Sequence, residues 1–121
     1  MKVWMDGEIV DGDDARIPVT DHGLLYGDGV FEGIRVYAGR VFRLDDHLRR
    51  LAFSAAYIGI ELPHSHAKLR QIVTATAEAH GADEAYVRLI VTRGDGELGV
   101  DPIGCDTPRC ICMVAGISLY P

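Results

Sequence analysis

The hydrophobic pattern of this chain changes its period twice, and this change restricts the fold more than any other feature. Residues 30–37 and 85–92 alternate their side chains with period two, which is typical of β-strands. Between them lie two stretches with the spacing of amphipathic helices, carried by Leu44, Leu48, Leu51, Ala55 and Ile58 and then by Leu69, Ile72, Val73, Thr76 and Ala79. The pattern predicts an α+β domain in which a mainly antiparallel sheet packs against two helices.

Turn signals add further strands to this sheet. The Asp-Gly dipeptide at 6–7 suits a type I′ turn and predicts a hairpin at the start of the chain. The Ala-Gly dipeptide at 38–39 turns the chain into a second short strand at 41–43. A last strand is predicted at 110–117, and no internal repeat or linker divides the chain.

Length, composition and charge argue against several classes of protein. With 121 residues, the chain has the size of one domain with a modest core. A formal net charge of −6 and the lack of a basic run argue against nucleic acid as a partner. No segment has the apolar length of a signal peptide core or a membrane span. The three cysteines form no Cys-x-x-Cys motif, so we expect reduced packing residues in a cytoplasmic protein.

Residues 22–35, HGLLYGDGVFEGIR, combine four glycines with large apolar side chains. A strand that only fills a core would contain little glycine, because glycine weakens the element and leaves nothing to pack. A flexible loop would contain few aromatic groups. The combination therefore favours a functional role over a purely structural one.

Three groups of residues could bind a ligand, and each has an ordinary structural alternative. Arg50 could clamp an anion, or it could belong to a solvated helix face. Tyr86 and Arg88 share one face of a predicted strand, which is either a solvated face or a surface that binds a carboxylate. Leu98 and Val100 lie in a glycine-rich loop, where exposed aliphatic side chains often meet a partner or a ligand.

A metal site is not expected. His64 and His66 lie at the entry of the second predicted helix, and no further histidine, cysteine or carboxylate follows them at ligand spacing. The sequence also has no Gly-x-Ser-x-Gly motif and no phosphate-binding P-loop.

Three motifs, taken together, resemble a known family. DHGLLYGDGVFEGIR at 21–35, FRLDDHLRRL at 42–51 and AYVRLIVTRGDGELGVDP at 85–102 follow in the order and spacing of class IV aminotransferases. These are the fold-type IV pyridoxal-phosphate enzymes, and the likeness is closest to branched-chain amino acid aminotransferases. The resemblance extends from about Val3 to the end of the chain. It implies that residues 1–121 are the small N-terminal domain of such an enzyme.

The resemblance also implies roles for individual residues. The implied substrate-binding residues are Tyr26, Phe31, Gly33, Tyr86, Arg88, Leu98, Gly99 and Val100. Tyr26 and the residues at 98–100 would reach across a homodimer interface, or that of a larger homo-oligomer, into the site of the other subunit. Arg50 would hold the phosphate of the cofactor, with a smaller contribution from Arg93. In such a site the glycines of residues 22–35 allow close backbone approach, and the aromatic side chains shape an apolar pocket.

The family joins pyridoxal 5'-phosphate to a lysine as a Schiff base, and no lysine of this chain matches that position. Its two lysines are Lys2 and Lys68. We therefore expect no catalytic residue in this chain, which should be inactive alone, and we expect the lysine in a larger second domain that begins near Pro121.

The resemblance implies that the intact enzyme moves the amino group of a branched-chain L-amino acid to 2-oxoglutarate, so that its small-molecule partners are an amino acid and a 2-oxo acid. Three alternatives remain open. Two belong to the same superfamily, a D-amino acid aminotransferase and an aminodeoxychorismate lyase. The third is a non-enzymatic, stand-alone domain that binds a partner through its exposed half-pocket.

Overall fold

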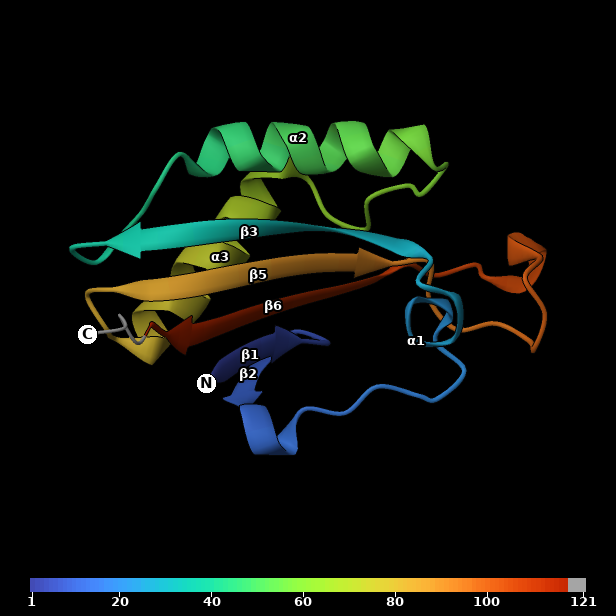
Figure 1. Cartoon of the computed structure of the whole chain (residues 1–121), viewed down its shortest axis with the longest axis horizontal. Helices are drawn as coiled ribbons and strands as arrows, with labels where there is room; N and C mark the ends of the chain where they lie inside the picture. The colour runs from blue at the N-terminus through green and yellow to red at the C-terminus, as the bar shows by residue number, and fades with distance from the viewer. Residues whose placement is uncertain (118–121) are drawn as a thin grey trace.

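A single antiparallel sheet forms the centre of the computed structural model, which describes residues 1–117 (Figure 1). Within that range the sheet has six strands in the order β2-β1-β6-β5-β3-β4. The strands are β1 (Lys2–Met5), β2 (Glu8–Asp11), β3 (Gly29–Tyr37), β4 (Arg40–Val41), β5 (Ala85–Thr92) and β6 (Arg109–Gly116). The helices are α1 (His22–Tyr26), α2 (Leu44–Tyr57) and α3 (His66–His80), with short 3-10 turns at Gly12–Asp14 and Pro102–Gly104. The predicted α+β fold is confirmed, because the strand pairs are antiparallel and the long helices pack on the sheet.

The alternation of β3 and β5 places their aliphatic side chains under the two long helices. Ile34 of β3 pairs in register with Val87 of β5, and both side chains are fully buried. They belong to the same core as Leu51 of α2 and Ile72 of α3. Burying one such side chain contributes about 1.5–3 kcal/mol, so this interface supplies most of the driving force for folding.

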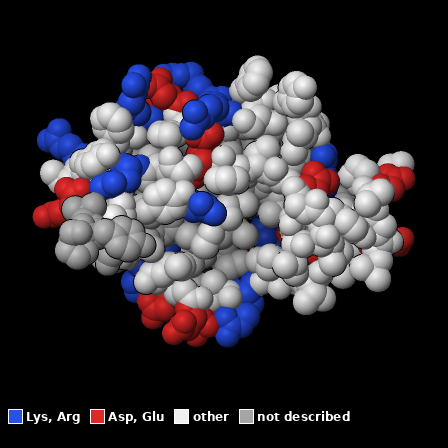
Figure 2. Space-filling view, viewed as in Figure 1, with Lys and Arg blue, Asp and Glu red and all other residues white. Residues whose placement is uncertain are grey.

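The opposite face of the sheet, called the open face below, is covered over only part of its area. Val3, Met5 and Ile111 form a smaller core there, against which Ala15 and Ile17 pack. On the half formed by β3 and β5, larger side chains stay exposed to solvent. In Figure 2, where α3 lies behind the sheet, the middle of this view is largely uncharged apart from an isolated basic area, and further charged side chains lie toward the margins. A surface that is apolar, solvent-exposed and carries a positive charge near its middle is suited to binding a small anion with an apolar chain.

Capping groups and left-handed residues mark both ends of α3 and the start of α2. The side chain of Ser65 accepts a hydrogen bond from the Lys68 backbone N–H at 3.1 Å, and Gly81 ends α3 in the left-handed region at φ 81°. Arg43 precedes α2 and also adopts a left-handed conformation, with φ 53°. This conformation interrupts extended backbone, so the strand predicted at 41–43 is wrong in its bounds and spans Arg40–Val41.

Helix α1 is not predicted by the hydrophobic pattern. It has five residues, and the Asp21 side chain caps it by accepting a hydrogen bond from the Gly23 backbone N–H at 2.7 Å. Gly27 ends the helix in the left-handed region at φ 66°. The cap and the terminal glycine are ordinary helix-end signals, but one and a half turns are too short for a helical period to appear.

Other differences at the edges of the sheet are small. Asp6 and Gly7 have φ values of 51° and 83°, which confirms the predicted type I′ turn. The last strand spans Arg109–Gly116, one residue earlier than the predicted 110–117. The interdomain connection predicted near the end falls on residues 118–121, which lie outside the described part of the chain. Of the helices within residues 1–117, none has both the length and the apolarity needed to cross a membrane.

Candidate active site

Arg88 is the centre of a group of residues on the open face, Phe31, Gly33, Tyr86 and Arg88, called the open-face cluster below. Its guanidinium carbon lies 4.7 Å from the ring centroid of Phe31 and 5.6 Å from that of Tyr86, within the range of cation–π attraction. Arg88 Nη2 also donates a hydrogen bond to the Tyr86 hydroxyl at 3.1 Å. Both aromatic rings therefore fix the orientation of one exposed cation.

Gly33 provides the space in which the Tyr86 hydroxyl lies. It pairs directly with Arg88 across the two strands, and a Cβ atom at Gly33 would lie 3.1 Å from Tyr86 Cζ and closer still to its hydroxyl. Any side chain at this position would displace the ring. The structure thus brings together the four residues that strand parity and the family motifs predict on one surface, while their role in substrate binding stays a prediction.

A cavity of about 350 Å³ opens beside the open-face cluster. Leu24, Phe31, Ile90 and Ile111 provide apolar walls, and Arg88 provides the positive charge. This combination suits a small molecule that has both an apolar chain and a carboxylate. A larger hollow of about 700 Å³ lies elsewhere, is lined by charges of both signs, and includes none of the predicted site residues.

A second charged group, called the Glu32 group below, lies on the helix side of β3 and consists of Glu32, His47 and Arg50. Glu32 is only 4% exposed. Arg50 Nε lies 2.9 Å from Glu32 Oε2 and 3.1 Å from Oε1, and Arg50 Nη2 donates to Oε1 at 2.8 Å. His47 Nδ1 lies 2.7 Å from the same Oε1. Burial alone would raise the pKa of Glu32, but the hydrogen bonds from Arg50 and His47 outweigh burial and lower it.

The open-face cluster and the Glu32 group meet across a single strand. Phe31 and Gly33 of β3 point to the open face, and Glu32 between them points to the helix side, because neighbouring residues of a strand face opposite ways. β4 pairs only with Val36 and Tyr37, so within residues 1–117 the outer edge of β3 before those residues has no strand partner. A molecule at this edge could contact both groups at once.

Tyr26 and the loop after β5 form a third region, at the end of the sheet where α1 lies (Figure 1). The Tyr26 hydroxyl accepts a hydrogen bond from the Gly99 backbone N–H. Leu98 and Val100 are 81% and 78% exposed, although both side chains are aliphatic. The structure therefore holds this loop in place and leaves its apolar side chains available for contact with another molecule.

A buried polar network anchors the same loop, and sequence reasoning missed it. Asp21 is fully buried, accepts hydrogen bonds from Thr92 Oγ1 at 2.8 Å and from Arg109 Nη1 at 2.5 Å, and also caps α1. Arg109 in turn binds both carboxylate oxygens of Asp95, at 2.9 and 3.1 Å. An aspartate directly before the first helical residue is the sequence signal of the cap, but nothing in the pattern predicts its partners 71 and 88 residues away.

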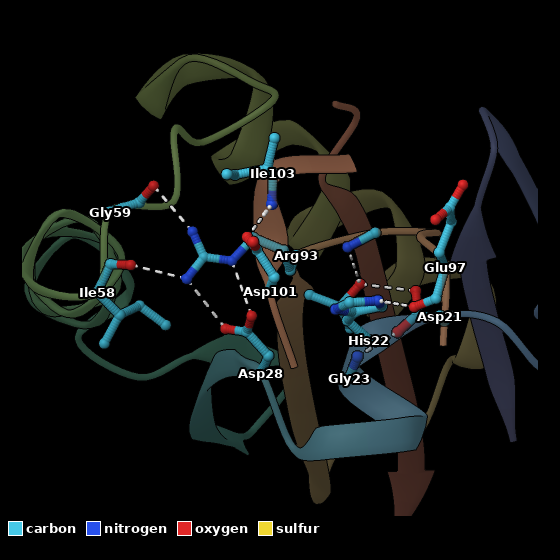
Figure 3. Close-up of polar contacts among 12 residues, drawn as sticks. Asp21, His22, Gly23, Asp28, Ile58, Gly59, Arg93, Glu97, Asp101 and Ile103 are labelled. Carbon is cyan, nitrogen blue, oxygen red and sulfur yellow. Dashed lines mark hydrogen bonds and ion pairs between the residues drawn. The ribbon is translucent and has the colours of Figure 1, made fainter. Parts of the chain in front are cut away.

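His22 connects α1 to the loop from the other side, as Figure 3 shows. Its side chain is fully buried, and Nε2 lies 2.9 Å from the Glu97 carbonyl oxygen, which assigns the proton to Nε2. A Cβ atom at Gly96 would lie 2.6 Å from His22 Nε2, so only glycine allows the loop to approach this closely. The rings of His22 and Tyr26 pack edge to face, with their centroids 4.9 Å apart.

Arg93 joins two elements of the fold, while the contribution to phosphate binding that the family resemblance implies stays a prediction. Its Nε and Nη2 donate to the two carboxylate oxygens of Asp28 at 2.9 and 3.1 Å (Figure 3). Nη2 and Nη1 also donate to the carbonyl oxygens of Ile58 and Gly59 at 2.8 and 3.1 Å. All three nitrogens are thus engaged, and they join the start of β3 to the end of α2.

The two lysines lie away from both charged groups. Lys2 Nζ pairs with Asp11 Oδ1 at 2.6 Å on the β1–β2 hairpin. Lys68 Nζ donates to Gln71 Oε1 at 3.0 Å along the exposed face of α3. Within residues 1–117, neither ammonium group bonds to a residue of the open-face cluster or of the Glu32 group.

The chain is similar to proteins of one family over nearly its whole length. The sequence profile of the family described as amino-transferase class IV matches residues 29–119. A putative branched-chain-amino-acid aminotransferase of Methanocaldococcus jannaschii is 47% identical over 113 residues, which cover 93% of this chain and 39% of that protein. The chain thus spans about two fifths of the length of the curated relatives it matches.

Solved structures agree with this family and with the fold. The branched-chain aminotransferase of Thermoproteus uzoniensis with norvaline has a TM-score of 0.86 and 35% identity, over 98% of this chain and 41% of that one. A T.th. branched-chain amino acid aminotransferase with pyridoxamine 5'-phosphate has a TM-score of 0.89 and 29% identity, over 98% of this chain and 40% of that one.

Relatives with other reactions are also similar. A D-alanine aminotransferase of Listeria monocytogenes is 36% identical over 94 residues, which cover 78% of this chain and 32% of that protein. The 4-amino-4-deoxychorismate lyase of Pseudomonas aeruginosa has a TM-score of 0.79 and 37% identity, over 98% of this chain and 41% of that one.

Proposed function

This chain belongs to the class IV aminotransferase family, and we propose that it is the small N-terminal domain of a pyridoxal-phosphate enzyme that moves the amino group of a branched-chain L-amino acid to 2-oxoglutarate. The observation that carries the proposal is the open-face cluster beside its apolar cavity. Arg88 can pair with a substrate carboxylate, and the aliphatic walls can accept a branched side chain. The relatives named for branched-chain aminotransferases support this substrate class.

The residues of this chain fit one part of a pyridoxal 5'-phosphate site. The Arg50 side chain is 66% exposed and cationic, and a buried carboxylate fixes its guanidinium. We propose that Arg50 holds the phosphate of the cofactor, because arginine suits bidentate contact with phosphate oxygens. When bound, the cofactor supplies the electron sink that amino transfer needs. The residues of this chain orient it and shape the substrate cavity.

The Schiff-base lysine would come from a second domain, because Lys2 and Lys68 lie away from both charged groups. The chain covers 39% of the Methanocaldococcus relative, so there is room in such an enzyme for that larger domain. We propose that the domain follows the described residues in the intact protein. Two free cysteines that are buried, Cys110 and Cys112, suit the reducing conditions of the cytoplasm.

We also propose that the enzyme works as a homodimer. Leu98 and Val100 are exposed aliphatic residues on a loop that Tyr26 and His22 hold in place. In Figure 2 the centre of the lobe formed by this loop and α1 is uncharged, and acidic groups lie at its margins, as in an interface with an apolar core and a polar rim. The proposal assigns Tyr26, Leu98, Gly99 and Val100 to the site of the neighbouring subunit.

Two alternative reactions can be tested directly, because the chain is also similar to a D-alanine aminotransferase and to a 4-amino-4-deoxychorismate lyase. The loop GDGELGVDP and the pair of Tyr86 with Arg88 favour the branched-chain reaction. The full-length protein should be assayed with L-leucine plus 2-oxoglutarate, with D-alanine plus 2-oxoglutarate, and with aminodeoxychorismate. We expect turnover with L-leucine; turnover restricted to either other substrate would assign the protein to that class.

A stand-alone binding domain is the remaining alternative, and the coding sequence after Pro121 separates it from the proposal. We expect a continuing frame with a lysine in a strand-like context. The chain 1–121 alone, incubated with pyridoxal 5'-phosphate and reduced with borohydride, should gain no site-specific pyridoxyl-lysine and should not turn over leucine. A stoichiometric modification of one lysine together with turnover would contradict the proposed second domain.

A further inference from the structure

Glu32 is a buried carboxylate in a position that a purely structural strand would give to an aliphatic residue. It is 4% exposed, and the next residue on the same side of β3 is Ile34, which is fully buried. Burying an ionised carboxylate costs free energy unless hydrogen bonds compensate it. Here they do, because Arg50 and His47 both bind it. The buried carboxylate of Glu32 therefore has an effect on its partners, above all on the orientation of Arg50.

Its first effect is on the geometry of Arg50. An arginine on an exposed helix face samples many rotamers, and the Arg50 side chain is 66% exposed. Glu32 binds the Nε edge of the guanidinium through both of its oxygens, at 2.8 to 3.1 Å. These contacts fix the plane of the Arg50 guanidinium group. A guanidinium has five N–H donors in all. The contacts with Glu32 use Nε and Nη2, and no group of residues 1–117 accepts from Nη1, which can therefore donate to a ligand.

His47 braces the carboxylate from a second direction. It lies one helical turn before Arg50 on α2, so the two side chains lie on the same face of that helix. His47 Nδ1 is 2.7 Å from Glu32 Oε1, and its side chain is 20% exposed. The carboxylate is thus held by two residues of α2, while its own backbone belongs to the strand that also carries Phe31 and Gly33.

We infer that Glu32 is a positioning residue for the cofactor phosphate: with His47 as its brace, it holds the Arg50 guanidinium so that the free Nη1 edge is presented at the open edge of β3. This inference rests on the proposed function. Its distinctive consequence is that Glu32, which touches no phosphate itself, contributes to cofactor affinity only when the ligand has a phosphate and only when Arg50 is present.

The neighbouring Arg49 offers a matched control. The Arg49 side chain is 66% exposed, like that of Arg50. It also binds a carboxylate, but this one belongs to Asp46 of α2, at 2.8 Å. Asp46 is exposed, however, and lies three residues away on the same helix. Arg49 therefore has the same charge and exposure as Arg50, but no buried carboxylate holds its guanidinium.

The test measures two dissociation constants with the apo form of the full-length protein, one for pyridoxamine 5'-phosphate and one for pyridoxamine. Neither ligand has an aldehyde, so no covalent bond to lysine enters the measurement. The parent should prefer the phosphorylated ligand strongly, and Arg50→Ala should lose most of that preference. Glu32→Gln should weaken binding of pyridoxamine 5'-phosphate by about tenfold and change the affinity for pyridoxamine by less than about twofold. His47→Gln should have a smaller effect in the same direction, and Arg49→Ala should have none.

The double variant Glu32→Gln/Arg50→Ala completes a thermodynamic cycle, and it should bind no worse than Arg50→Ala alone. Because both readouts are ratios of affinities for two ligands on one folded protein, partial loss of stability does not alter them. The inference is overturned if Glu32→Gln keeps the phosphate preference of the parent, or if it weakens both ligands equally. A parent protein without any phosphate preference would overturn the proposed function, and the inference with it.

Discussion

Replacement of Gly33 by alanine tests whether the open-face cluster depends on an absent side chain. The new Cβ would lie 3.1 Å from Tyr86 Cζ and closer to its hydroxyl. Carbon atoms prefer about 3.5–4.0 Å, so the end of the tyrosine ring must move by roughly 0.5–1 Å. This movement breaks the 3.1 Å hydrogen bond from Arg88, which then loses its fixed orientation.

The size of the effect follows from that hydrogen bond. A bond that involves a charged group contributes about 1.5–3 kcal/mol, and solvent at the exposed Arg88 favours the lower end of this range. Since about 1.4 kcal/mol is a factor of ten, the KM of the full-length enzyme for its amino donor should rise about tenfold. The melting temperature should change little, because alanine in a strand recovers about 0.5–1 kcal/mol of backbone entropy relative to glycine.

Steady-state kinetics and thermal melts of Gly33→Ala and Gly116→Ala provide the comparison. Gly116 also lies in a strand, but a Cβ there would meet no atom within 4 Å, so Gly116→Ala should behave like the parent. Tyr86→Phe should reproduce the rise in KM, and adding Gly33→Ala to it should have little further effect. An unchanged KM for Gly33→Ala, or a rise that merely accompanies a fall in melting temperature, would refute the reasoning.

Four further predictions concern other parts of the chain. Burial raises the pKa of Cys110 and of Cys112 to about 12, so iodoacetamide at about pH 8 should label both only after unfolding, as mass spectrometry can show. Asp21→Ala removes a fully buried carboxylate that pairs with Arg109, accepts from Thr92 and caps α1, and should lower the free energy of unfolding by about 3 kcal/mol in urea titrations. The pKa of Glu32 is lowered, so its contribution to stability should be lost as pH falls below about 4.5, and Glu32→Gln should flatten that part of the stability profile. Val100→Asp should impair the site of the neighbouring subunit; in mixed dimers, damage confined to the mutated chain's own site would contradict the cross-subunit assignment.

The sequence predicts the parts of this fold whose period is long enough to be detected. Helices α2 and α3 extend over three turns or more, and their buried positions follow the helical spacing. Successive side chains of a strand point to opposite faces of the sheet. Together with the register of β3 and β5, this alternation places Phe31 and Arg88 on one face. Helix α1 escapes prediction because it has five residues and contains a glycine.

The polar contacts between different elements could not be predicted, because each joins segments that are far apart in the chain. Glu32 meets Arg50 18 residues later, and Arg93 meets Asp28 65 residues earlier. Pattern reasoning gives the face on which a side chain lies but not the distance to a charge on another element. For this reason the sequence does not indicate that Arg93 joins the start of β3 to the end of α2.

A crystal structure of the full-length protein with pyridoxal 5'-phosphate and the unreactive substrate analogue 4-methylvalerate would test the central claim most directly. We expect phosphate oxygens about 2.7–3.2 Å from Arg50 Nη1, the analogue's carboxylate at Arg88, and its branched chain in the cavity beside Phe31. We also expect Val100 of the partner subunit at the same site. A structure in which the phosphate is held away from Arg50, or in which the open-face cluster faces solvent with the analogue bound elsewhere, would contradict this claim.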